Sequence, residues 1–300
     1  MGLEQKLIIG FNATFVHPGR FYLGGFSDMA HDNYYYVFLC FVYIFTVVGN
    51  VLLILIIFLI KTLHTPKYMI VFSLALTDLC GSTALIPKLL DTFLFDRRYI
   101  LYEACLSYMF FVLFFASIQS WTLVIMAYVR FIAIWFPLRY HSIVTKTSIA
   151  AMLTFEWLLI TTIVASTVGL IDRLSFCGSF VVKSFFCDHG PVFYLAWNDT
   201  SLNRIMAYVA LVSFICIPLI LIAFTYERNV ILVAIFFLPL VGTNIAAVAS
   251  YVHPNARIIN STLTYTIPAL LNPIIYALKT EEVMNAVKKL WKKKTFINTA

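Results

Sequence analysis

The sequence is poor in charge. Charged residues make up 12% of its 300 residues, whereas hydrophobic residues make up 62%. A soluble domain is about 25% charged and about 45–50% apolar, so this chain lacks the polar side chains that a water-facing surface needs. The deficit argues against an ordinary soluble domain and favours lipid as the solvent.

Two kinds of targeting segment are also lacking. Residues 1–20 contain Glu4, Lys6 and Pro18, and their longest apolar stretch is too short for the core of a signal peptide. Residues 297–300 contain no cysteine that could carry a prenyl group. We therefore expect the first long apolar run to act as its own membrane-insertion signal.

Long apolar runs are what the sequence has instead. A membrane-crossing helix needs about 20 mainly apolar residues, and seven runs meet that requirement. They are residues 36–60, 68–90, 105–135, 149–171, 206–226, 230–250 and 258–278, the last being the most polar. No stretch alternates with the period of two that barrel strands show. The expected fold class is an all-α membrane protein, a bundle of seven transmembrane helices over residues 36–278.

Several prolines fall inside these runs or near their ends. They are Pro87, Pro218, Pro239, Pro268 and Pro273. A proline removes one N–H from a helix and frees a carbonyl, which membrane helices tolerate when a neighbouring helix satisfies that carbonyl. We therefore expect kinked helices at these positions, not helix ends.

Lysine and arginine are unevenly distributed between the loops. With the N-terminus outside, the inner side contains twelve of them against three acidic residues, and the outer side contains nine against nine. This is the bias of the positive-inside rule, so we expect residues 1–35 to be extracellular. Two glycosylation sequons, at Asn12 and Asn198, also fall on the outer side. The formal net charge of +7 thus indicates orientation, not a nucleic-acid partner.

The segment after the last run, residues 279–300, is basic and amphipathic. Val283, Val287, Leu290 and Trp291 recur at helical spacing, with lysines on the opposite face. Such a helix lies in the membrane interface against anionic lipid, which makes membrane lipid an expected partner. The alternative is a solvated basic tail on the cytoplasmic side.

Local motifs distinguish between the classes of seven-helix protein. The motifs are Gly49-Asn50, LHTPKY from Leu63, LTDL from Leu76, MAYVRFIAI from Met126, PLRY from Pro137 and NPIIY from Asn272. In this order they resemble the odorant receptor family, from about the first run to the final helix. The stretch FFCDHGP, beginning at Phe185, most resembles fish odorant receptors.

The resemblance implies a plasma-membrane receptor that binds an odorant and signals through a heterotrimeric G protein. It pairs Cys105 with Cys187 in a disulfide over the outer mouth, two free cysteines being the alternative. The activation residues that it implies are Arg130, Tyr226, Asn272, Pro273 and Tyr276. The polar core that it implies, around sodium or water, consists of Asn50, Asp78 and Asn272. A buried carboxylate is costly in lipid, so Asp78 should face the bundle interior; a protonated aspartate that only bonds a neighbouring helix is the alternative.

The expected ligand class follows mainly from missing groups. Residues 105–121 contain no acid to pair with an amine, and residues 258–278 contain no lysine to hold retinal. A small, weakly polar molecule is therefore expected. The resemblance gives Leu113, Ala116, Ser117, Phe214, Asn244 and Tyr265 as its contacts, with Ser117 and Asn244 orienting it. Each of these residues also fits ordinary helix packing.

The chain departs from the family pattern in three places. Val129 stands where an acid normally precedes Arg130, and residues 227–229 replace the usual inner loop between the fifth and sixth runs. We expect the bundle to fold but G-protein coupling to be impaired or lost. Trp197 replaces the usual partner of Cys177, which should therefore be free.

A transporter or channel is the main alternative, and a receptor remnant that does not signal is another. A transporter would show an internal repeat or broken, charged helices, whereas the only acids inside the runs are Asp78 and Glu156, the latter with no role that the resemblance assigns. No nucleophile–base pair or metal-ligand cluster is apparent at one membrane depth. We therefore expect no enzymatic activity, no cofactor and no bound metal.

Overall fold

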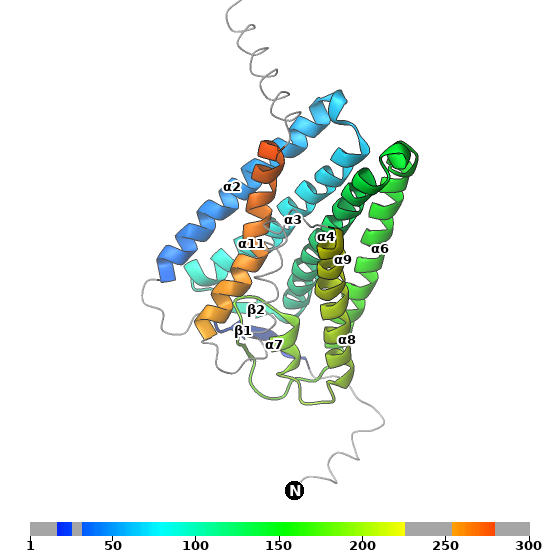
Figure 1. The fold of residues 1–300 in the computed structure, drawn as a ribbon. Helices are drawn as coiled ribbons and strands as arrows, with labels where there is room; N and C mark the ends of the chain where they lie inside the picture. Colours follow the sequence, from blue (N-terminus) through cyan, green and yellow to red (C-terminus); the bar gives the residue numbers. More distant parts are fainter. Residues whose placement is uncertain (1–16, 26–31, 226–253, 280–300) are drawn as a thin grey trace, which may run out of the picture.

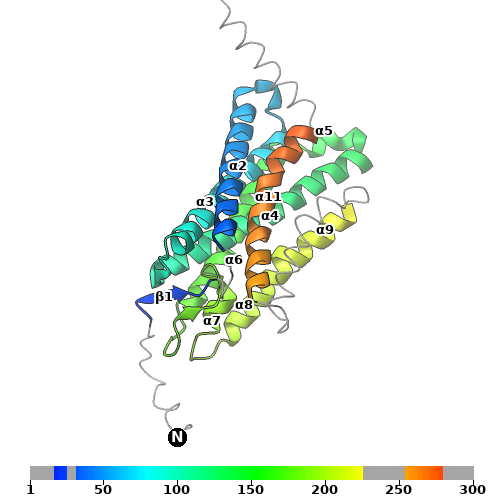
Figure 2. The same ribbon diagram turned by 90° about the vertical axis from the view of Figure 1, so that its left-hand side faces the viewer.

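The computed structural model describes residues 17–25, 32–225 and 254–279. Its main feature is a set of long helices that lie side by side between the two ends of the molecule (Figures 1 and 2). Their bounds are α2 Asp32–Leu59, α3 Pro66–Leu94, α4 Tyr102–Trp135, α6 Lys146–Ile171, α8 Ser201–Leu211, α9 Ile217–Thr225 and α11 Pro254–Lys279. A π-helical turn, η3 (Val212–Cys216), joins α8 to α9. Short helices occur in the connections: η1 Lys61–Leu63, η2 Pro137–Arg139, α5 Tyr140–Ile143 and α7 His189–Phe193.

The helices agree with the apolar runs of the sequence. In the described part of the chain, 5 helices are long and apolar enough to cross a membrane. The more polar α11 occupies the place of the expected run 258–278. The expected run 230–250 and the amphipathic tail at 279–300 lie outside the described residues, apart from the last residue of α11. The all-α membrane fold predicted from composition is confirmed.

Local sequence explains several helix ends. Pro66 occupies the first turn of α3, where a missing N–H is harmless. Thr145 caps α6 by accepting a hydrogen bond from the backbone N–H of Ser148 at 3.1 Å. The helix α4 ends at Trp135, two residues before Pro137, because the residue before a proline is biased away from helical geometry.

A three-stranded sheet covers one end of the bundle, beside α7 (Figure 1). The strand β1 (Arg20–Leu23) lies between β2 (Tyr99–Leu101), to which it is antiparallel, and β3 (Val181–Val182), to which it is parallel. Phe21 and Leu23 of β1 are buried. Residues 1–35 were predicted only to be an extracellular segment. The strand β1 within them was not predicted.

Glycine allows two helix pairs to approach closely. A Cβ at Gly49 of α2 would lie 3.3 Å from the Pro273 Cβ of α11, and one at Gly81 of α3 would lie 3.0 Å from the Phe115 Cβ of α4. Both distances are tighter than ordinary van der Waals contact, so a larger residue would push the helices apart. These contacts place α2, α3, α4 and α11 near enough for their polar side chains to meet.

Candidate functional site

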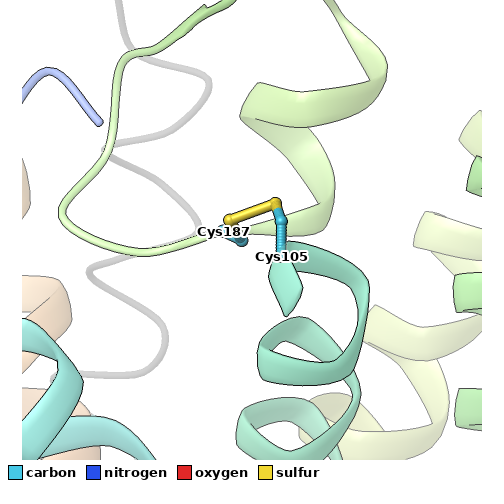
Figure 3. Close-up of a disulfide and its surroundings, with 2 residues drawn as sticks. All are labelled: Cys105 and Cys187. Atoms are coloured by element: carbon cyan, nitrogen blue, oxygen red, sulfur yellow. A yellow bond between two sulfur atoms is a disulfide. The ribbon is translucent and has the colours of Figure 1, made fainter. Parts of the chain in front are cut away.

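The predicted disulfide between Cys105 and Cys187 is formed (Figure 3). Cys105 lies in the first turn of α4, and Cys187 lies in the long loop that follows α6; their Cα atoms are 5.5 Å apart. Both residues are fully buried. The bond therefore fixes the second half of this loop over the end of α4, as the resemblance implied.

Hydrogen bonds close the same loop where the family has a second bridge. Cys177 is free and exposed, as expected. The backbone N–H of Trp197 donates to the Ser175 carbonyl at 2.9 Å. The Asn198 amide donates to the Arg173 carbonyl at 3.0 Å and accepts from the Ser175 N–H at 3.1 Å. The first and last segments of the loop, residues 173–175 and 197–198, are thus held together without a second disulfide.

Asp78 is the centre of the buried polar core. Its two carboxylate oxygens accept hydrogen bonds from Gln119 at 2.7 Å and from Asn272 at 2.9 Å. The predicted pair of Asp78 and Asn272 is therefore present, and Gln119 is a partner that the sequence analysis missed. Each carboxylate oxygen keeps a further lone pair beyond these bonds, so the sodium or water expected at this site stays a prediction.

Asn50, the third residue expected in this core, bonds a different partner. Its side-chain amide donates to the Ala269 carbonyl of α11 at 3.1 Å and to the Thr46 carbonyl at 2.9 Å. Ala269 lies four residues before Pro273, so its carbonyl has no helical N–H to accept from. Asn50 satisfies the carbonyl that the proline frees, as the rule for prolines in membrane helices requires.

Four consecutive residues of α4, Gln119 to Thr122, each bond a different acceptor on a neighbouring helix. We call them the polar belt. Beyond Gln119, Ser120 donates to the Phe214 carbonyl at 2.7 Å and Trp121 to the Ser213 carbonyl at 3.1 Å, both in η3. Phe214 lies four residues before Pro218, so its carbonyl is again one that a proline frees. The belt therefore connects α4 to α3, η3 and α6.

The last bond of the polar belt accounts for Glu156. Thr122 donates to Glu156 Oε1 at 2.9 Å, and both side chains are buried between α4 and α6. Within the described residues, Glu156 Oε2 has no hydrogen-bond partner. Glu156 is thus a link between two helices, a role that neither its position in a run nor the resemblance had assigned.

The predicted ligand contacts lie in two neighbouring apolar clusters. Leu113 packs against both of them, Phe214 packs against the cluster that contains Phe114, and Tyr265 packs against the cluster that contains Phe186. Ala116 is half-buried and is not placed in contact with the others. The hydroxyl of Ser117 donates to the Leu113 carbonyl at 2.7 Å, which leaves only its oxygen to meet a ligand. Asn244 lies outside the described residues.

The predicted activation residues lie toward the other end of the bundle. Arg130 is half-buried on α4 and follows a buried Val129. Pro273 is buried in α11, whose last turn contains Tyr276, while Tyr226 lies outside the described residues. Beyond α4, the Leu138 side chain is 99% exposed.

A second set of polar groups lies beside the disulfide. We call Phe186, Asp188, His189 and Tyr265 the outer cluster. Burial raises the pKa of Asp188 to about 6 and lowers the pKa of His189 to about 4. The Tyr265 hydroxyl lies within electrostatic range of the Asp188 carboxylate. The sequence analysis had noted this loop motif only as a resemblance.

The residues missed by the sequence analysis had weak signals. Gln119, Ser120 and Thr122 are three polar residues within four positions of a hydrophobic run, and their spacing around α4 could have indicated bonds to several helices. The direction of each bond depends on helix packing, which one sequence does not give. The polar residues of the loop, Asp188 and His189, have no periodic pattern at all.

Comparison with known proteins identifies the family. The family model described as "Olfactory receptor" matches residues 39–239. The rat "Olfactory receptor 1468" is 33% identical over 291 residues, covering 88% of this chain and 91% of the relative. The mouse "Olfactory receptor 1J1" is 33% identical and covers 84% and 88% of the two chains, and the human "Olfactory receptor 1J4" is 31% identical and covers 85% and 89%. None of these matches favours a transporter, a channel or an enzyme. The sequence motifs, the loop disulfide and these matches together show that this chain belongs to the olfactory receptor family.

Proposed function

We propose that this receptor holds a small, weakly polar odorant between the outer halves of its helices and signals to a heterotrimeric G protein. The observation that carries the proposal is the match to olfactory receptors over most of the chain. The disulfide-anchored loop above α4 adds support, because it fixes one wall of the candidate site. The expected contacts Leu113, Phe214 and Tyr265 all lie in apolar clusters on that half.

The orientation we propose places the N-terminus outside the cell. The disulfide requires an oxidising compartment, so the end of α4 that contains Cys105 should face the extracellular side. The strand β1 pairs with β2 and β3 at the same end, which puts the N-terminal segment there too. This agrees with the excess of lysine and arginine on the opposite side.

The proposed ligand site is tested by filling it. Leu113→Trp adds a large ring where two apolar clusters meet, so the odorant should be displaced. The matched control is Leu158→Trp, on a lipid-facing position of α6 that is 64% exposed. Purified receptor is heated with a panel of odorants, and cyclic AMP is recorded in transfected cells. Thermal stabilisation by any odorant should disappear in Leu113→Trp and persist in the control.

An equal loss in both variants, or no loss in either, would remove Leu113 from the site. If no odorant of the panel stabilises or activates wild-type receptor that has reached the cell surface, the proposed function itself fails. The thermal measurement is needed beside cyclic AMP because it does not depend on G-protein coupling.

We further propose that coupling is weakened. Two sequence features support this: Val129 removes the acid that normally pairs with Arg130, and the connection at residues 227–229 is short. Inserting the corresponding inner loop of a full-length relative should raise the cyclic AMP amplitude without changing odorant stabilisation. A full amplitude in the unmodified receptor would contradict weakened coupling.

Three finer predictions remain proposals. Residues 280–294 are proposed to bind anionic lipid, and Asn12 and Asn198 to carry glycans. Asn198 is exposed, which supports its access to the glycosylation machinery. The likeness to fish receptors rests on the motif that begins at Phe185, whereas the relatives named above come from rat, mouse and human.

A further inference from the structure

Asp188 of the outer cluster has a carboxylate without a counter-ion in the part of the chain that the structure describes. No basic side chain of the described residues forms an ion pair with it. It precedes the short helix α7, yet its side chain makes no capping hydrogen bond to that helix. The neighbouring backbone N–H of His189 lowers the pKa of this carboxylate, but by less than burial raises it. Neither an ion pair nor helix capping therefore explains a carboxylate at this position.

The neighbouring imidazole does not neutralise this charge. His189 is buried, packs against the Phe193 ring at a centroid distance of 5.1 Å, and has an Nε2 atom without a partner in the described residues. Because burial lowers its pKa to about 4, His189 is neutral at pH 7. Burial raises the pKa of Asp188 only to about 6, so the carboxylate is mostly ionised at pH 7.4. Among the described residues, this negative charge has no positive partner.

Aromatic rings lie on one side of this charge, where Tyr265 is within electrostatic range of Asp188 and packs against Phe186. Phe186 is fully buried and meets the ring of Tyr108 at 6.2 Å and the ring of Tyr265 at 5.8 Å, both nearly edge-on. Tyr265 also carries the hydroxyl within electrostatic range of Asp188, and the described structure gives that hydroxyl no hydrogen-bond partner. Aromatic rings attract cations and exclude water, which strengthens a charge pair formed beside them.

We propose that Asp188, together with the rings of Phe186 and Tyr265, binds the ammonium group of a primary-amine odorant. The ammonium donates a hydrogen bond to the Asp188 carboxylate, while the alkyl part of the odorant lies toward Leu113. This inference rests on the proposed function and adds to its weakly polar ligands a second class, alkyl amines with one charged group. The sequence analysis had argued against amines because residues 105–121 contain no acid; here the loop supplies the acid.

Hexylamine and hexanol are suitable probes because they differ only in the charged group. Full-length receptor with an N-terminal tag is purified in detergent and its thermal midpoint is measured with each probe. The variant is Asp188→Asn, which keeps the shape and removes the charge. The matched control is Asp199→Asn, in the same loop, where the exposed carboxylate already accepts hydrogen bonds from Ser201 at 2.6 and 3.0 Å.

Wild type and Asp199→Asn should bind hexylamine at least tenfold more tightly than hexanol. In Asp188→Asn this preference should vanish, with hexanol affinity unchanged. Asp188→Glu keeps the charge and should still bind hexylamine more tightly than hexanol. This variant tests the amine site if Asp188→Asn does not reach the cell surface. Equal binding of the two probes to wild type, or an equal loss of both in Asp188→Asn, would overturn the amine site. In either case binding of neutral odorants elsewhere in the panel would leave the proposed function standing.

Discussion

The polar belt and the outer cluster differ in whether their polar side chains have hydrogen-bond partners in the described structure. In the belt, all four side chains from Gln119 to Thr122 donate to an acceptor on another helix. In the outer cluster, among the described residues, Asp188 forms no ion pair and makes no capping hydrogen bond, and His189 Nε2 has no hydrogen-bond partner. Both regions are largely shielded from water, where an unpaired polar group costs about 1–3 kcal/mol. The comparison indicates that the belt stabilises the bundle and that the outer cluster is incomplete without a ligand.

The largest loss of stability should come from removing the carboxylate of Asp78 at the centre of the bundle. Asp78→Ala leaves the amides of Gln119 and Asn272 without their acceptor at once, so we expect a loss of about 4 kcal/mol in the free energy of unfolding. Surface labelling and the thermal midpoint in detergent measure this. Asp78→Asn is the matched control and should lose roughly half as much, since one acceptor oxygen remains. Normal stability of Asp78→Ala would show that these bonds contribute nothing.

A slightly smaller loss should follow from releasing the loop. Cys187→Ser removes a bond that closes 82 residues, and such a disulfide typically contributes about 3 kcal/mol. Odorant stabilisation should fall together with the thermal midpoint, because Asp188 is adjacent to the lost bond. The control is Cys177→Ser, which changes an exposed free thiol and should be neutral. If both serine variants behave alike, the loop does not depend on the disulfide.

The sequence predicted the helices well because an apolar run of about 20 residues crosses lipid as a helix, which pairs its backbone groups within the segment. The family resemblance implied the contact of Asp78 with Asn272, whereas the cost of a buried carboxylate predicted only that Asp78 faces the bundle interior. The sequence did not predict β1, whose pairing depends on two distant loops, or the placement of Asn50, whose acceptor is freed by a proline elsewhere in the chain. These features depend on tertiary packing and leave no local pattern.

A moderate effect should separate charge from hydrogen bonding at the edge of the belt. Glu156→Gln keeps an acceptor for Thr122, whereas Glu156→Ala removes it. We therefore expect Gln to leave the thermal midpoint unchanged or higher and Ala to cost about 1–2 kcal/mol. The same purified samples provide the measurement. A destabilising Gln with a harmless Ala would mean that the negative charge itself is required.

The smallest effect should be a dependence on pH. His189 has a lowered pKa, so its folded form binds fewer protons and loses stability as pH falls from about 6.5 toward 4. Asp188 has a raised pKa, so its folded form binds more protons and gains stability as pH falls from about 6 toward 4. The two effects oppose each other in wild type. When the pH is lowered from 7 to 5, the thermal midpoint should therefore fall in Asp188→Asn and rise in His189→Gln. The same change of midpoint with pH in both variants would contradict the two pKa shifts.

One pair of variants tests the contrast between the two regions most directly. Asp78→Asn and Asp188→Asn make the same chemical change, and their thermal midpoints can be measured side by side at pH 7.4 without ligand. Asp78→Asn should lower the midpoint, because a donor loses its acceptor, whereas Asp188→Asn should leave it unchanged or raise it, because a buried charge without a partner is removed. A lower midpoint in Asp188→Asn, with Asp78→Asn unaffected, would show that the assignment of the two regions is reversed.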